Sequence, residues 1–227
     1  WRRLRRCCEG PGRAVALDLP NPTGAAEWNS RAAFLTPITK AFGTDVGVEV
    51  AQMGVQVHGG MGVIEETGAA QYCRDVRVTA IYEGTNGIQA MDLVARKMMD
   101  GGEAANRLMD EIEAHAEAAR DAFPNMADAV WQATETLREA TEWLVAQDDM
   151  DTRFAGAVPY LRAFARVLGG HLHLKAALAD KGGPRDKLAR FYILLLMPER
   201  AGLRVQSQSG AVDRLPLHTV DLVARGP

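Results

Sequence analysis

Apolar side chains recur every three or four residues along most of this chain, and alternation with a period of two is scarce. This spacing is typical of amphipathic helices. The first clear stripe covers residues 34–57, where one helical face would hold Phe34, Ile38, Phe42, Val46, Val50 and Met53. Because Pro37 follows Thr36, we expect Thr36 to be the N-cap and Pro37 to lie in the first turn. The glycines after His58 should end this helix.

Glycines, prolines and apolar spacing after residue 62 predict further helices separated by short links. A short helix is expected over 65–74, an irregular stretch over 75–83, and another helix from Thr85 to the pair Gly101-Gly102. Amphipathic helices should follow over 103–121, 125–148, 154–180 and 185–197, with a short one near 213–222. Long helices with short links favour an antiparallel bundle. The pattern therefore predicts an all-α fold, with residues 31–102 and 103–227 as two helical units after an N-terminal segment, 1–30.

Composition narrows the possible functions. The chain has 227 residues, 47% of them hydrophobic, with a net charge of −3 and a pI near 6.0. These values argue against a nucleic-acid partner, which would need a clustered positive face. No window approaches the roughly 20 apolar residues of a membrane helix. The three cysteines, Cys7, Cys8 and Cys73, have no metal-ligand spacing and favour a reduced, cytoplasmic protein.

Histidine spacing argues against a metal site. His171 and His173 are two residues apart in a predicted helix, so their side chains should point to different faces. We therefore expect the chain to bind no metal.

Two segments differ from ordinary bundle sequence. The first is the glycine-rich stretch from Gln56 to Gly62, whose backbone could approach a phosphate or a flat ring closely. On the residues alone, a loop that only stops the helix is the favoured interpretation. Between the two segments, the run from Arg74 to Arg77 predicts an ion-pair network that pins a loop.

The second segment places Glu83 in irregular backbone just before a helix N-terminus, where the helix dipole favours negative charge. An ionised carboxylate there could act as a general base, and a bound apolar chain would desolvate it. The alternative is a glutamate that merely satisfies the dipole, with Thr85 or Asn86 as the cap. On the residues alone, that alternative is favoured.

Several motifs in register change this balance. Their order is Glu49-Val50-Ala51, Gln56-Val57-His58-Gly59-Gly60-Met61-Gly62, Glu65-Glu66-Thr67-Gly68, Arg74-Asp75-Val76-Arg77 and Ile81-Tyr82-Glu83-Gly84-Thr85-Asn86-Gly87-Ile88-Gln89. Together they resemble the last helices of the acyl-CoA dehydrogenase catalytic domain. The stretch Leu35–Phe42 and the helices after Gly102 look like the longer bacterial members, the group that includes 3-methylmercaptopropionyl-CoA dehydrogenase, which carry an extra C-terminal helical domain. Residues 1–13 match poorly.

The resemblance implies roles for particular residues. Glu83 would remove the α-proton of an acyl-CoA thioester, its backbone N–H would polarise the thioester carbonyl, and Gly84 would lie against the substrate. The β-hydrogen would pass to FAD as hydride, giving a trans-2-enoyl-CoA. Positions that match cofactor contacts are Gln56, Gly59 and Gly60, facing the FAD of a neighbouring subunit, and Thr85 and Gly87. Gly87 stands where shorter members often carry Glu or Gln.

The resemblance also implies partners and a limitation. An electron-transfer flavoprotein would reoxidise the flavin, and the enzyme would be a homo-oligomer. The N-terminal helical domain and β-barrel of family members have no counterpart in these 227 residues, so we expect the chain alone neither to hold FAD tightly nor to turn over substrate. Alternatives are a stand-alone helical interaction module without catalysis, an acyl-CoA oxidase, and a DNA-associated relative. The many acidic residues over 103–153 count against the last.

Overall fold

The computed structural model describes residues 22–210, and all the regular elements among them are helical. The long helices are α3 (Pro22–Val57), α6 (Glu103–Ala119), α7 (Pro124–Val145) and α8 (Met150–Leu178). Shorter ones are α4 (Ala69–Arg77), α5 (Asn86–Val94), α9 (Pro184–Phe191) and α10 (Arg200–Gln208). This confirms the all-α prediction. The short helix expected near 213–222 lies outside the described residues.

Short 3₁₀ and π segments join these helices. The 3₁₀ turns η1 (Gly59–Val63) and η2 (Glu65–Thr67) connect α3 to α4, and η3 (Val78–Ala80) follows α4. Another, η4 (Arg96–Met98), follows α5, while the π-helical segment η5 (Tyr192–Leu196) and the turn η6 (Met197–Glu199) connect α9 to α10. The helix expected over 65–74 thus begins and ends later than predicted.

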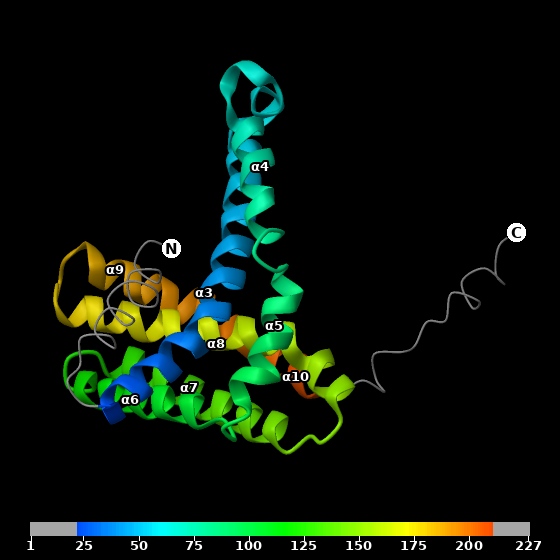
Figure 1. Ribbon diagram of the computed structural model, residues 1–227. Helices are drawn as coiled ribbons and strands as arrows, with labels where there is room; N and C mark the ends of the chain where they lie inside the picture. The colour runs from blue at the N-terminus through cyan, green and yellow to red at the C-terminus, as the bar shows by residue number, and fades with distance from the viewer. Residues whose placement is uncertain (1–21, 211–227) are drawn as a thin grey trace, which may run out of the picture.

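The molecule has two visibly different parts (Figure 1). Helices α6 to α10, α5 and the first half of α3 form a bundle, from which the second half of α3 and the antiparallel α4 project as an arm. We call residues 50–77 the arm. The turns η1 and η2 form its tip, and α5 returns the chain to the bundle.

Helix α3 corrects one expectation. It begins at Pro22, so Pro37 lies in its interior and Thr36 is not an N-cap; the Thr36 hydroxyl instead donates to the Ala32 carbonyl at 2.7 Å. An interior proline costs about 3 kcal/mol relative to alanine. The helix continues because Phe34, Leu35 and Ile38 are all buried around this point. Tertiary packing therefore outweighs the local preference.

Helix α8 is the centre of the bundle. Helices α3, α5, α6, α7, α9 and α10 all pack against it. Two of its glycines allow close approach: a Cβ at Gly156 would lie 2.3 Å from the Ser207 carbonyl oxygen, and one at Gly169 would lie 2.1 Å from the Tyr192 hydroxyl. The hydrophobic core is continuous from Phe34 through α5 and α6 to Leu203. The division into two units at Gly102 remains a prediction.

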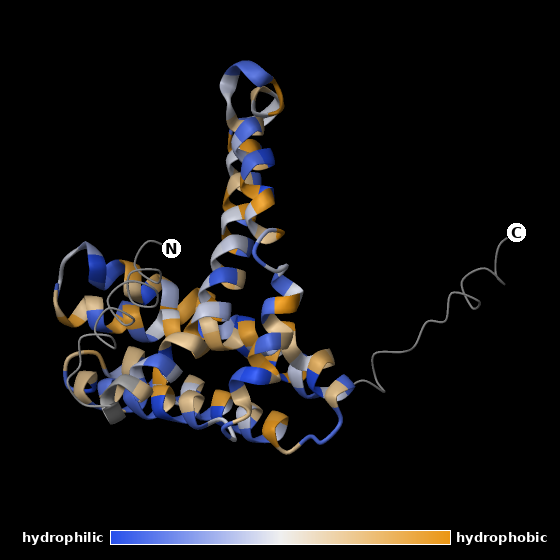
Figure 2. Cartoon of the chain, in the orientation of Figure 1, coloured by the Kyte–Doolittle hydropathy of each residue, from blue (hydrophilic) through white to orange (hydrophobic). Residues whose placement is uncertain are grey.

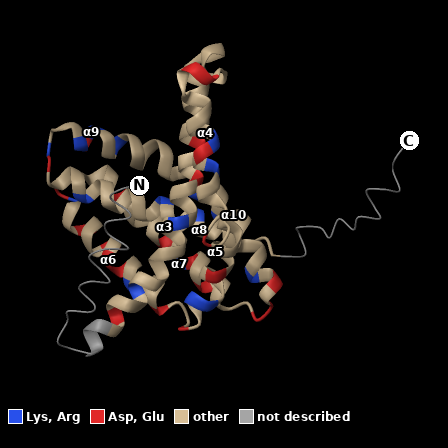
Figure 3. Ribbon diagram, turned by 45° about the horizontal axis from the view of Figure 1, so that its top comes forward, with Lys and Arg blue, Asp and Glu red and all other residues tan. Residues whose placement is uncertain are grey.

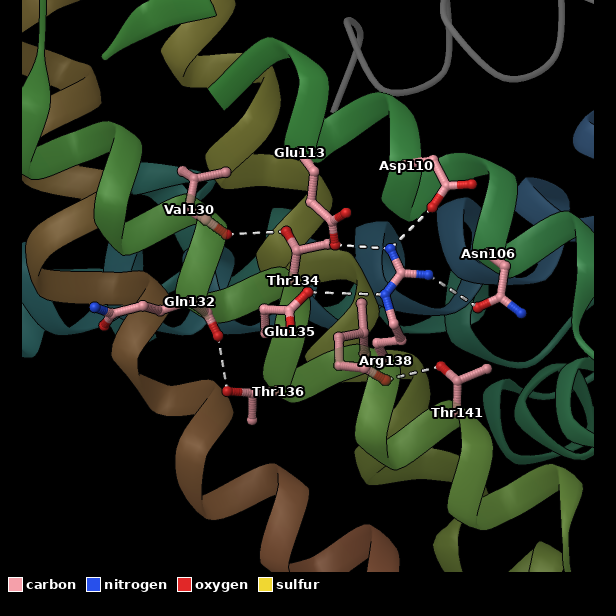
Figure 4. Close-up of polar contacts among 11 residues, drawn as sticks. Asn106, Asp110, Glu113, Val130, Gln132, Thr134, Glu135, Thr136, Arg138 and Thr141 are labelled. Carbon is pink, nitrogen blue, oxygen red and sulfur yellow. Dashed lines mark hydrogen bonds and ion pairs between the residues drawn. The ribbon is translucent and has the colours of Figure 1, made fainter. Parts of the chain in front are cut away.

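An ion-pair network joins α6 to α7 on the surface of this bundle (Figure 4). The Arg138 guanidinium of α7 contacts Asp110 at 2.9 Å and Glu113 at 2.7 Å, both on α6. Burial opposes the charge of Arg138, but the hydrogen bonds to Glu113 and Asp110 raise its pKa above the usual value. The two helices are therefore held in register by polar contacts as well as by their shared apolar face.

No helix within residues 22–210 combines the length and the apolar character needed to cross a bilayer.

Candidate active site

The backbone of Glu83 has an unusual conformation. Glu83 has φ = 55°, and it is the only non-glycine residue with positive φ in the described part of the chain. Gly84 follows with φ = 85°. Left-handed backbone is unfavourable for a glutamate, and such strain is found mainly at functional sites, where the surroundings enforce it. The conformation makes Glu83 the leading candidate for a catalytic side chain.

Two side chains from different helices hold this turn. The Gln89 Nε2 of α5 donates to the Glu83 carbonyl at 2.9 Å, and the Lys40 Nζ of α3 donates to the Gly84 carbonyl at 2.6 Å. A Cβ at Gly84 would lie 3.1 Å from Gln89 Nε2, and the residue that carried it would have to adopt a positive φ. Both the position of Gly84 in the turn and its missing side chain are therefore needed.

Asn86 links the start of α5, just after the Glu83 turn, to α3. Its amide nitrogen donates to Asp45 at 2.6 Å and Thr44 at 2.9 Å, while its amide oxygen accepts from Lys40 at 2.9 Å. Burial lowers the pKa of Lys40, and the nearby charges of Asp45 and Glu83 partly oppose that shift. The network links α3 firmly to the start of α5.

Sequence reasoning missed this network. The sequence gives Lys40 no role beyond its place in the stretch Leu35–Phe42, and it offers Asn86 only as an alternative cap. The structure shows Thr85 as the cap, accepting from the Ile88 N–H at 3.4 Å. The one available signal was Thr44 and Asp45, two polar residues next to a predicted apolar stripe, and their partner in α5 could not be read from the sequence.

The side chain and N–H of Glu83 are both accessible. The side chain is exposed, and the backbone N–H makes no hydrogen bond within residues 22–210. Large apolar side chains that are at least 40% exposed lie close to it in the chain: Ile81, Tyr82, Ile88 and Met91. A carboxylate bordered by exposed apolar surface can meet an apolar substrate that, on binding, shields it from water.

The other predicted cofactor residues fall into two places. Thr85 and Gly87 lie beside Glu83 at the foot of the arm, whereas Gln56, Gly59 and Gly60 lie near its tip (Figure 1). Lys40, which contacts the Glu83 turn, precedes Gln56 by roughly 24 Å along α3. The structure therefore does not bring these two groups together within one chain.

The tip itself is shaped by its glycines. A Cβ at Gly62 would lie 2.2 Å from the Val55 carbonyl oxygen, so the loop can fold back against α3 only with glycine there. Gly59 and Gly60 are exposed, and a Cβ at either would meet nothing within 4 Å. Their open backbone fits the close approach of a phosphate or a flat ring.

A groove and an ion pair lie between the helices of the arm. The groove has a volume of about 510 Å³ and is lined by Val48, Val55 and Cys73 among others. Arg74, which lines it too, makes a two-point ion pair with Glu65 at 2.9 Å for each contact, and this raises the pKa of Arg74 and lowers that of Glu65. The expected ion pair thus exists, but its acid is Glu65 of η2 rather than Asp75.

Comparison with known proteins gives two family matches. Residues 24–99 match the acyl-CoA dehydrogenase C-terminal domain, and residues 108–216 match a domain described as acetyl-CoA dehydrogenase C-terminal like. These two ranges contain the Glu83 turn and most of the bundle, respectively.

Individual relatives agree with these matches. The chain is 41% identical over 206 residues to 3-methylmercaptopropionyl-CoA dehydrogenase of Ruegeria pomeroyi. The aligned region covers 82% of this chain and 35% of that protein. The chain is also 29% identical over 189 residues to a butyryl-CoA dehydrogenase of Syntrophomonas wolfei, covering 73% of this chain and 30% of that protein. The chain thus spans about a third of the length of these relatives. It belongs to the acyl-CoA dehydrogenase family.

Proposed function

We propose that this chain supplies the catalytic base of an FAD-dependent acyl-CoA dehydrogenase, with the Glu83 carboxylate removing the α-proton of an acyl-CoA thioester. The observation that carries the proposal is the strained, exposed Glu83 turn, held by Gln89 and Lys40. A strained residue persists only where its surroundings enforce it. Such conformational strain is hard to explain for a glutamate that only satisfies a helix dipole.

The backbone supports a second role for the same residue. The unbonded Glu83 N–H can donate to the thioester carbonyl oxygen as negative charge develops there. Gly84, with no side chain, would let the acyl chain pass close to the carboxylate. Exposed Ile81, Tyr82 and Ile88 would then contact the acyl chain and exclude water.

We propose two separate sets of FAD contacts. FAD, when bound, supplies the acceptor for the hydride that leaves the β-carbon. We assign Thr85 and Gly87 to the FAD next to Glu83 of the same chain, and Gln56, Gly59 and Gly60 to the FAD of a neighbouring subunit. The separation of these groups along the arm supports this division. We further propose a homo-oligomer and reoxidation by an electron-transfer flavoprotein.

Replacing Glu83 with Gln tests the base directly. The substitution keeps the shape but removes the proton acceptor, so turnover of acyl-CoA by the complete, flavin-loaded enzyme that contains this chain should fall by at least the ~10²–10⁴-fold typical of general base catalysis. Flavin content should not change. Glu142→Gln, at an exposed position on α7, is the matched control and should retain full activity. Normal turnover in Glu83→Gln would mean that Glu83 is not the base.

Because the chain spans about a third of its relatives, we also propose that FAD and acyl-CoA need residues beyond these 227 for tight binding. The purified chain, titrated with FAD and followed by flavin fluorescence, should show no saturable binding. A yellow chain that an acyl-CoA bleaches under anaerobic conditions would contradict this.

The charge distribution bears on one alternative. Figure 3 shows acidic residues (red) along α6 and α7, with a few basic residues (blue) among them. Arg138 and Arg120 are paired with carboxylates there rather than gathered into a positive face. The DNA-associated alternative would need such a face.

A further inference from the structure

Two histidines from different helices meet inside the bundle, away from Glu83. His115 lies on α6 and His171 on α8, with ring centroids 4.9 Å apart and the rings tilted by 48°. Glu111 lies one turn before His115 on the same face of α6. Spacing within α8 had argued against a site for His171 and His173, and His173 does point elsewhere, stacking on Tyr192. The partner of His171 comes from another helix.

The three side chains have the arrangement of a metal-ligand set. One donor atom from each of Glu111, His115 and His171 lies within 4.8 Å of the other two. The Glu111 Oε1 is 3.9 Å from His171 Nε2. Ligands about 2.0–2.1 Å from a tetrahedral ion are roughly 3.3 Å apart. Rotamer changes that close these separations by up to roughly 1.5 Å would thus bring the three donor atoms to bonding geometry.

His171 provides an independent observation. Its side chain is only 4% exposed, Nδ1 is buried without a hydrogen-bond partner, and the 3.9 Å separation from Glu111 is too long for a hydrogen bond at Nε2. A neutral imidazole carries one N–H and one lone pair, and buried polar atoms are almost always satisfied. Neither ring nitrogen of His171 thus has a hydrogen bond within the described residues, and an ion at Nε2, the nitrogen 3.9 Å from Glu111 Oε1, would supply a partner for that nitrogen.

The other two side chains are already oriented as ligands usually are. His115 Nδ1 lies 2.9 Å from the Glu111 carbonyl oxygen, so it can donate there and leave the Nε2 lone pair free. Arg31 of α3 contacts Oε2 of Glu111, which fixes the carboxylate and leaves Oε1 facing the histidines. A backbone carbonyl behind a ligating histidine and a hydrogen-bonded carboxylate are common outer contacts of metal sites.

The surrounding charge selects the kind of ion. Burial opposes the charge of Glu111, but the contact with Arg31 holds its pKa below the ordinary value. Arg31 and Lys175 also weaken the pull of this carboxylate on a cation. An oxygen-seeking ion such as Mg²⁺ or Ca²⁺ would find one partly neutralised ligand here. Two imidazoles favour a transition metal such as Zn²⁺.

We propose that Glu111, His115 and His171 form a binding site for a divalent transition-metal ion, with Zn²⁺ as the fitting ion, that clamps α6 to α8. His115 has a side chain that is 37% exposed, which gives the ion a path from solvent and leaves a fourth position for water. We assign the ion a structural role because the site is separate from the Glu83 turn. Arg31, which contacts Glu111, precedes Lys40, which contacts the Glu83 turn, by about 13 Å along α3.

Metal titration of the chelator-treated chain tests the proposal. Calorimetry with Zn²⁺ should show saturable binding of one ion per chain, and Co²⁺ should give the visible absorption bands of a low-coordinate site. His115→Ala, at a partly exposed position, should weaken binding by more than the ~10–100-fold that loss of an outer contact costs. His171→Ala should do the same, with circular dichroism to show that the bundle remains folded.

His173→Ala is the matched control, because His173 shares α8 with His171 but stacks on Tyr192. It should bind Zn²⁺ as tightly as the unmodified chain. Absence of saturable binding in the unmodified chain would overturn the proposal. So would equal affinities in His115→Ala and His173→Ala, because the ion would then lie elsewhere.

Discussion

The bundle and the arm treat their apolar residues differently, although one helix runs through both. In α3, Phe34, Ile38 and Phe42 are buried within the bundle, whereas Val50 and Met53, next on the same stripe, are 60% and 64% exposed. Figure 2 shows apolar residues (orange) continuing beyond the bundle along the arm, where α4 runs beside α3. An apolar stripe therefore predicts a surface to be covered, but says nothing of what covers it.

Other large apolar side chains of the arm are exposed as well. They are Val57, Met61 and Val63 at the tip and Tyr72 on α4. Large exposed apolar side chains gathered on one projecting element favour an interaction site. The bundle completes its own core, while the arm presents apolar surface together with the glycine loop, as the proposed contact with a neighbouring subunit requires.

A core truncation should separate the two parts most sharply. Phe164 of α8 is fully buried and packs edge-to-face on Phe34 and Tyr160. Phe164→Ala should lower the free energy of unfolding by about 3–5 kcal/mol, because it leaves a cavity. Tyr72→Ala, at a 75% exposed position on the arm, should change it by less than about 0.5 kcal/mol. Urea unfolding followed by circular dichroism measures both, and similar losses would mean that the arm is part of the cooperative core.

The bundle should also respond to mild acid. Burial lowers the pKa of His171 from its ordinary 6.5 to about 4, helped by the nearby His115 and Lys175. Between these values the unfolded chain binds a proton that the folded chain does not, so this contribution is complete above pH 6.5 and lost as the pH falls towards 4. At ~1.4 kcal/mol per pKa unit, the loss is on the order of 3 kcal/mol.

The measurement is the free energy of unfolding between pH 7 and pH 4, with chelator present. His171→Leu removes the titrating group and should reduce the loss of stability on acidification relative to the unmodified chain. Parallel pH profiles for the two proteins would show that His171 is protonated in the folded state over this range.

Alanine substitutions at one glycine in the bundle and one in the arm should change stability in opposite directions, by smaller amounts. Gly156→Ala in α8 would force a Cβ against the Ser207 carbonyl of α10 and should cost about 1–3 kcal/mol. Gly54→Ala in the arm part of α3 meets no atom within 4 Å and should stabilise the chain by about 0.5–1 kcal/mol through better helix propensity. Thermal unfolding should move in opposite directions, and a destabilised Gly54→Ala would indicate a close contact on the arm.

Local signals predicted the ends of elements well where a glycine or a link supplies the physical reason. The helix over 34–57 ends at Val57 as expected, and α6 begins right after Gly101-Gly102, both of which have positive φ. The same signals failed at Thr36-Pro37, where packing of α3 outweighs the preference of proline for a first turn. The segment expected as a helix over 185–197 is helical, but its change from α9 to the π-helical η5 at Tyr192, which lies against Gly169 of α8, was not predicted.

For the site, the motifs singled out Glu83 and its neighbours, but not what supports them. Lys40 and Asn86 contact each other across α3 and α5, and no local pattern relates them. Similarly, the run from Arg74 to Arg77 predicted an ion pair, yet the acid is Glu65, which the return of the chain at the arm tip brings to Arg74. Roles assigned to Gln56, Gly59, Gly60, Thr85 and Gly87 remain predictions.

By itself, the sequence determined the helical class, the family and the position of the candidate base, because these depend on periodicity and on motifs within short stretches. Only the tertiary structure decided that Glu83 lies in a left-handed turn held by Lys40 and Gln89, and that His115 meets His171. Both depend on side chains from helices that are distant along the chain. Their meeting is set by how α3, α6 and α8 pack in the bundle, which no local pattern encodes.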